Sequence, residues 1–292
     1  IYVRNLIKRQ NEIKNSIEEQ GKMTPELSLA IDKVEKLQEL EDIYLPYKQK
    51  KRTRAMIAKE KGLEPLAQFI LKQEDSSEKL EDIALKYLND EVTSSDEALA
   101  GASDIIAETI SDSADIRAKL RQHLWQTSSL SITRDKEADS DEAFLMYEDY
   151  TEPIKHLPSH RILAINRGES KDILKVKLIS DIDKDIAIIT KFILKQNSPY
   201  KEFLTNAIID AYKRLIFPAL EREIRNQLTE TAQTQAIHVF ASNLKQLLLQ
   251  APLAGYTVMG LDPGYRTGCK MAIVDATGQV LDHGVLYITM SD

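Results

Sequence analysis

The sequence predicts a mainly α-helical protein that ends in a short antiparallel β-sheet. Its 292 residues include only 10 glycines and 9 prolines, well below the roughly 12% that these two residues average in proteins. So few turn residues disfavour a β-sandwich or a barrel. Apolar residues make up 42% of the chain, which is enough to bury a core and excludes a disordered chain.

The glycines mark a boundary near Gly255. Four lie in the first 254 residues and six in the last 38. Apolar residues recur at helical spacing before this point, whereas alternating strands and tight turns follow it. We therefore expect a helical region at residues 1–255 and a second domain at residues 256–292.

Capping residues predict where the helices of the first region begin. Thr24 is a typical N-cap, followed by Pro25 at the first helical position and by Glu26. The helix that starts here is expected to run to Leu45 and to stop at Pro46. Further helices are expected at the chain start and at residues 53–61, 64–73, 78–88, 96–111, 114–126, 159–167, 183–195 and 200–216. Short strands are expected at residues 129–134 and 173–180.

The longest expected element covers residues 219–250. Its apolar residues recur without a breaker, and about 32 residues at 1.5 Å each give a helix of about 48 Å. Such a length is typical of a spine between parts of a larger molecule. Two helices with a bend near residues 229–234 are the alternative.

The last segment predicts three strands in an antiparallel meander, at residues 256–261, 269–275 and 280–288. The first strand ends in Gly260-Leu261-Asp262-Pro263-Gly264. An aspartate in this position suits metal binding in two-metal phosphoryl chemistry or the phosphate hairpin of an actin-like ATPase. A plain turn is the other reading, since Asp, Pro and Gly all favour turns.

Charge and cysteine content limit the function classes. The formal net charge is −7, and the single cysteine, Cys269, excludes an intramolecular disulfide and a cysteine-based zinc site. No apolar run approaches the roughly 18 residues of a membrane span. Complete P-loop, nucleophile-elbow and H-E-x-x-H motifs are absent. Because Ile1 already lies in helical spacing, we expect a fragment of a cytoplasmic protein with no cofactor and no membrane contact.

One cluster of positive charge stands out, and we call it the basic segment. It consists of Lys48, Lys50, Lys51, Arg52, Arg54, Lys59 and Lys61, opposed within the same stretch only by Glu60. Such a cluster on an acidic chain attracts phosphates, and the nearby Tyr44 and Tyr47 offer rings for base stacking. The alternative is a solvated surface whose cations pair with surrounding acids.

Seven stretches together carry a resemblance to a known family. They read LEDIYLPYK (40–48), KRTRA (51–55), EKGLEPLA (60–67), PSHR (158–161), NRGE (166–169), DAYKRL (210–215) and GLDPGYRTGCK (260–270). In this order they resemble the bacterial Tex family of transcription accessory proteins, which is related to eukaryotic elongation factors. The similarity extends over nearly the whole chain.

The resemblance implies a longer parent with a helical N-terminal region and a long central helix. A YqgF domain of RNase H/RuvC-like α/β fold follows, and then helix-hairpin-helix and OB-type RNA-binding domains. This chain would stop after the first three YqgF strands. RNA or DNA, and the transcription machinery, are the partners that the resemblance implies for the full-length parent.

Asp262 matches the first-strand aspartate with which RuvC-like nucleases hold magnesium. Those enzymes use further acids on later elements, and one carboxylate cannot clamp two metals. We therefore expect no metal site and no enzymatic activity in this chain. The expected role is a helical scaffold with a weak phosphate-contact surface in a nucleic-acid-binding protein. The alternatives are a metal-dependent nuclease or actin-like ATPase built on Asp262, and a pure protein-interaction scaffold.

Overall fold

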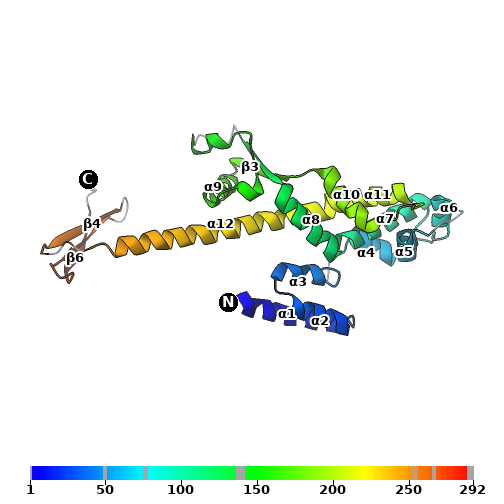
Figure 1. Cartoon of the computed structure of the whole chain (residues 1–292), viewed down its shortest axis with the longest axis horizontal. Coiled ribbons are helices and arrows are strands. Elements are labelled where there is room, and N and C mark those ends of the chain that lie inside the picture. The colour runs from blue at the N-terminus through cyan, green and yellow to red at the C-terminus, as the bar shows by residue number, and fades with distance from the viewer. Residues whose placement is uncertain are drawn as a thin grey trace. The chain divides into compact units, whose positions relative to one another are not determined.

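The computed structural model describes residues 2–48, 51–74, 78–135, 142–251, 253, 255–264 and 268–287 (Figure 1). The chain divides into two compact units, residues 1–233 and 234–292. The domain boundary expected near Gly255 from composition stays a prediction.

The first three helices, α1 (Tyr2–Glu19), α2 (Pro25–Lys33) and α3 (Leu37–Tyr44), form a group with its own small core. Thr24 caps α2 as predicted, and its Oγ1 accepts a hydrogen bond of 3.2 Å from the Leu27 amide. The single helix expected up to Leu45 is wrong, because the chain turns extended at Val34 and Lys36. Gln10 of α1 explains this break, since its side-chain amide donates to the carbonyls of Ile31 and Val34 at 2.8 and 3.2 Å.

Five helices follow and build much of the main core. They are α4 (Arg54–Glu60), α5 (Glu64–Lys72), α6 (Leu80–Leu85), α7 (Ser95–Ser111) and α8 (Ala114–Thr127). Thr53, Ser94 and Ser113 cap α4, α7 and α8 through their side-chain oxygens. The prediction of these helices is confirmed, although α6 is shorter than the expected residues 78–88.

A three-stranded antiparallel sheet is inserted between these helices and the later ones. Its strands are β1 (Ser129–Arg134), β2 (Tyr150–Pro153) and β3 (Leu174–Ile179), with β1 in the centre. Leu130 and Ile132 of β1 are buried, and Leu130 pairs with Leu178 of β3. Strands β1 and β3 were predicted and β2 was not. Short helical turns η1 (Glu142–Tyr147) and η2 (Ile154–His156) and helix α9 (Ser159–Ser170) complete this part.

The last helices of the first unit run into one long element. They are α10 (Ile182–Ile193), α11 (Lys201–Asp210) and the π-helical turn η3 (Ala211–Ile216), followed by α12 (Phe217–Leu248), whose residues from 234 on belong to the second unit. Helix α12 has 32 residues without a break, which confirms the long helix and excludes the bend near residues 229–234. Its buried residues are Leu220, Ile224, Leu228 and Ala232, whereas Ile237, Phe240 and Leu247 are exposed. No helix among the described residues is long and apolar enough to cross a membrane.

The second unit contains the predicted meander of β4 (Val258–Gly264), β5 (Gly268–Val274) and β6 (Val280–Leu286), in the order β4-β5-β6. The turn between β5 and β6 is fixed by Asp275, whose Oδ1 accepts hydrogen bonds from the amides of Thr277 and Gln279 at 2.8 and 2.9 Å. Gly278 supplies the left-handed conformation that this turn requires, with φ of 87°. The mainly helical fold class followed by a short sheet is therefore confirmed.

Candidate nucleic-acid interface

The basic segment lies around helix α4. Lys48 follows α3, Lys51 and Arg52 precede the cap of α4, and Arg54 and Lys59 belong to the helix. Lys61 follows its last residue, whereas Lys50 lies outside the described residues. Thr53 starts α4 here because its Oγ1 accepts a hydrogen bond of 3.1 Å from the Met56 amide. The sequence cluster is thus also a cluster along one short stretch of structure.

Three of these cations are paired with acids. Arg52 lies 3.2 Å from Glu60, Lys59 lies 3.8 Å from Glu64, and Lys61 lies 2.8 Å from Glu97. The hydrogen bond from Lys61 lowers the pKa of Glu97. Such solvent-exposed pairs are weak, so a phosphate can compete for the cation.

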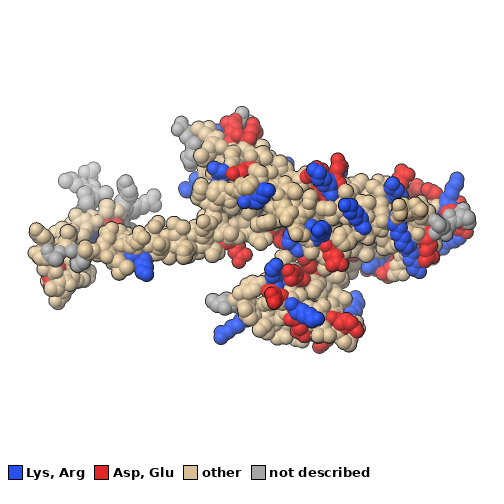
Figure 2. All heavy atoms as spheres, viewed as in Figure 1, with Lys and Arg blue, Asp and Glu red and all other residues tan. Residues whose placement is uncertain are grey.

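The exposed side chains of Lys48, Lys51 and Arg54 form no ion pair with any described residue. Figure 2 shows Lys and Arg side chains interspersed with Asp and Glu over the helical unit, with no broad surface of one sign in this view. The positive potential is therefore local. It is suited to a few phosphate contacts and carries no base information by itself.

The two tyrosines that offer rings for base stacking have structural contacts of their own. Tyr44 and Tyr47 pack against the small core of α1–α3. The hydroxyl of Tyr44 lies 3.0 Å from Ser16 Oγ, and the guanidinium carbon of Arg9 lies 5.7 Å from its ring centroid. Both rings therefore stabilise this helical group, and base stacking by their remaining exposed surface stays a prediction.

A groove between α4 and α7 lies next to the basic segment and was not predicted. It has a volume of about 210 Å³ and is lined by Arg54, Ile57, Ala58, Lys61, Leu63, Glu97, Ala100, Gly101 and Asp104. The two helices approach closely at Gly101, where an added Cβ would lie 3.2 Å from Ala58 Cβ of α4 and 2.3 Å from Leu63 Cδ1, just after α4. The one signal in the sequence was a glycine inside an otherwise regular helix.

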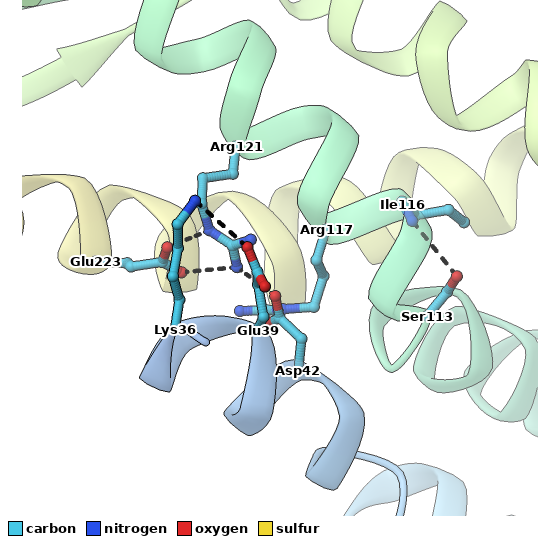
Figure 3. Close-up of polar contacts among 8 residues, drawn as sticks. All are labelled: Lys36, Glu39, Asp42, Ser113, Ile116, Arg117, Arg121 and Glu223. Carbon is cyan, nitrogen blue, oxygen red and sulfur yellow. Dashed lines mark hydrogen bonds and ion pairs between the residues drawn. The ribbon is translucent and has the colours of Figure 1, made fainter. Parts of the chain in front are cut away.

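A buried network of ion pairs connects α3 to α8 and α12 of the same unit (Figure 3). Asp42 of α3 accepts hydrogen bonds from Arg117 Nε at 3.1 Å and Arg121 Nη2 at 2.7 Å, both on α8. Arg121 also bonds Glu223 of α12. Asp42 and Arg117 are only 4% and 7% exposed. Asp42, which belongs to the first of the seven stretches, therefore has a structural role.

Two further stretches also connect helices. Asn166 of α9 donates to Thr229 Oγ1 of α12 at 2.8 Å, and Glu169 pairs with Arg225. Arg214 bonds Asp210 and, at 3.0 Å, Asp104 of α7. The polar residues of these two stretches therefore connect neighbouring helices, like Asp42.

Asp262 lies exposed on β4, opposite Lys270 of β5. Among the residues with described positions, no three His, Cys, Asp or Glu side chains gather into a possible metal site. A single carboxylate beside a lysine does not fit a two-magnesium centre of the RuvC type.

The comparisons agree with this architecture of a helical unit followed by the first strands of a second domain. The family model described as Tex central region-like matches residues 75–240, and the Tex protein YqgF-like domain matches residues 256–292. The class of protein is thus a helical core joined to a YqgF-like domain. The chain belongs to the Tex family.

Three relatives illustrate the similarity, each aligned to 98% of this chain. They are the protein YdcI of Bacillus subtilis (47% identical, 40% of the relative covered), the transcriptional accessory protein Tex of Neisseria gonorrhoeae (39% identical, 39% covered) and the human S1 RNA-binding domain-containing protein 1 (33% identical, 30% covered). The chain therefore spans about 40% or less of the length of these relatives.

Proposed function

We propose that this chain is the helical scaffold of a nucleic-acid-binding transcription accessory protein of the cytoplasm, and that its basic segment contacts phosphates. The observation that carries this proposal is the group of exposed, unpaired cations Lys48, Lys51 and Arg54 next to α4. The names of the Neisseria and human relatives support it, since one is a transcriptional accessory protein and the other an RNA-binding-domain protein.

The test compares two quadruple variants of the chain. The first changes Lys50, Lys51, Arg52 and Arg54 to Ala. The matched control changes Lys119, Lys155, Lys191 and Lys201 to Ala, four exposed lysines outside the basic segment with the same total charge. Binding to single-stranded RNA and to duplex DNA is measured by fluorescence anisotropy at several salt concentrations.

Wild-type binding is expected to be weak, with Kd on the order of 10⁻⁴–10⁻⁶ M at physiological salt. The first variant should bind all sequences more weakly to a similar degree, and its salt slope should flatten by about one unit for each phosphate that the cations no longer neutralise. The control should retain most of the affinity. Unchanged affinity and slope in the first variant would remove the basic segment from the function.

The proposal includes no catalytic role. No group of three or more possible metal ligands among the described residues includes Asp262, and a two-metal centre needs several carboxylates, which supports a non-enzymatic role. A protein-interaction scaffold for the transcription machinery is the second candidate. The exposed apolar residues Ile237, Phe240 and Leu247 of α12 favour it, because exposed apolar patches mark protein contact sites. Pull-down of RNA polymerase by wild-type chain and by Phe240→Asp tests this candidate.

A further inference from the structure

We propose that the groove between α4 and α7 receives one base of a single-stranded nucleic acid whose phosphates contact the basic segment. This inference rests on the proposed function and names the form of nucleic acid that the site takes. Arg54 belongs both to the basic segment and to the lining of the groove. The phosphate and the base of one nucleotide would therefore contact neighbouring residues.

The size and the floor of the groove suit a flat ring. Its volume of about 210 Å³ is below the roughly 300–1,000 Å³ of pockets that take drug-sized ligands. Ile57, Ala58, Leu63, Ala100 and Gly101 form an apolar floor. Ala100 is exposed on the α7 side of the groove, and burying a base face against apolar side chains is favourable.

The polar rim can discriminate between bases. Asp104 Oδ1 accepts a hydrogen bond of 3.0 Å from Arg214, whereas Oδ2 accepts none from a described residue. Partial burial raises the pKa of Asp104. Carboxylates accept hydrogen bonds from exocyclic amino groups, as Asp and Glu do from cytosine. Adenine, cytosine and guanine carry such a group, and uracil and thymine do not.

The charge beside the groove favours a polyanion over an apolar protein side chain. Arg54 lines the groove and forms no ion pair within 4 Å with a described residue, although its charge acts on the Asp104 carboxylate, and Lys51 lies three residues before it. A phosphate next to the inserted base would be within reach of a cation. The rim carboxylates Glu97 and Asp104 are each paired with a cation, at 2.8 and 3.0 Å, which limits their repulsion of phosphate.

The test fills the groove without changing its charge. Ala100 is exposed on α7, so Ala100→Trp places a ring in the groove, and Ala118→Trp puts the same ring at an exposed position on α8 as the control. The probes are oligo(A), oligo(C) and oligo(U) RNA, the DNA oligonucleotides dA, dC and dT, and an abasic DNA strand. Circular dichroism and thermal unfolding confirm that both variants fold.

We expect wild type and Ala118→Trp to bind oligo(A) and oligo(C) more tightly than oligo(U), and the abasic strand most weakly. Ala100→Trp should bind oligo(A) and oligo(C) about 10-fold more weakly, because the apolar contact area of one base is lost. Its salt slope should not change, because the same cations still neutralise the phosphates. If the DNA oligonucleotides show the same order of affinities as the RNA oligonucleotides, the base and not the sugar is recognised.

The two proposals fail in different ways. If Ala100→Trp binds every strand as wild type does, or if the abasic strand binds wild type as tightly as the others, the groove proposal is overturned and the basic segment is unaffected. A protein side chain as the true occupant would give this same result. If the quadruple basic variant keeps wild-type affinity and salt slope, or if wild type binds no strand, both proposals are overturned.

Discussion

The hydroxyl of Tyr212 donates a hydrogen bond of 2.5 Å to Oδ2 of Asp185, a carboxylate with no solvent exposure. Ser180 Oγ donates to the same oxygen at 2.6 Å. His123 Nε2 lies 3.4 Å from the other oxygen. A buried carboxylate without donors is costly, so the two hydroxyls are what allow Asp185 to stand at the start of α10 inside the core.

Removal of the Tyr212 hydroxyl should therefore destabilise the protein. Tyr212→Phe leaves the ring in place and takes one donor from a buried carboxylate, which should lower the free energy of unfolding by about 1.5–3 kcal/mol. Urea unfolding measures this loss. Tyr256→Phe is the control, since Tyr256 is 69% exposed. A loss below about 0.5 kcal/mol in Tyr212→Phe would mean that Ser180 alone satisfies Asp185.

The same hydroxyl should make stability fall in alkali. Burial, with the hydrogen bond to Asp185, raises the pKa of Tyr212 above its usual value. The unfolded chain then releases this proton from about pH 10, whereas the folded protein keeps it, so the free energy of unfolding decreases above about pH 10. The stability difference between wild type and Tyr212→Phe should shrink from about pH 8 to about pH 11. A constant difference would contradict this assignment.

Loss of the Asp42 carboxylate should detach α1–α3 from the other helices of the first unit. Asp42→Ala leaves the buried Arg117 without its partner, and breaking such a pair costs about 3–5 kcal/mol. Urea unfolding and limited proteolysis, which should cut between α3 and α4 first, check the result. Lys8→Ala is the control, because its side chain is 79% exposed and its ion pair is 3.9 Å long. A cost under about 1 kcal/mol for Asp42→Ala would show that the network contributes little.

Nuclease activity should be absent from this chain. Asp262 faces Lys270 across the β4–β5 ladder, and one carboxylate does not hold two metal ions. Incubation with labelled RNA and DNA in Mg²⁺ or Mn²⁺ should give no cleavage above buffer. Cleavage that Asp262→Asn abolishes and Asp282→Asn preserves would overturn this prediction.

Local signals in the sequence predicted most helices, because caps such as Thr24, Thr53 and Ser113 act within a few residues. The break after α2 depends on Gln10, which lies far from it along the chain, so no local pattern contains it. Strand β2 has only four residues, too few for a periodicity to be visible. Its place is set by pairing with β1.

For the candidate site, too, only the features that are local in the sequence were predicted. The cations around α4 are visible as a charge cluster, but the pairing of Lys61 with Glu97 joins residues 36 positions apart. The groove exists because α7 packs on α4, and this tertiary contact leaves only Gly101 as a trace in the sequence. Tyr44 and Tyr47 also pack against the core of α1–α3, a tertiary contact that the sequence pattern does not contain.

The π-helical turn η3 sets the angular phase of the helix that follows it. A π-helical turn contains about one residue more than an α-helical turn. Each residue of an α-helix rotates the chain by about 100° around the helix axis. Deletion of one residue from 211–216 would restore a regular helix from α11 into α12. It would also rotate Leu220, Ile224 and Leu228, which are now buried, by about 100° away from the core. A one-residue deletion in this turn therefore changes which face of α12 is buried, and it exposes core side chains that lie one to several turns downstream.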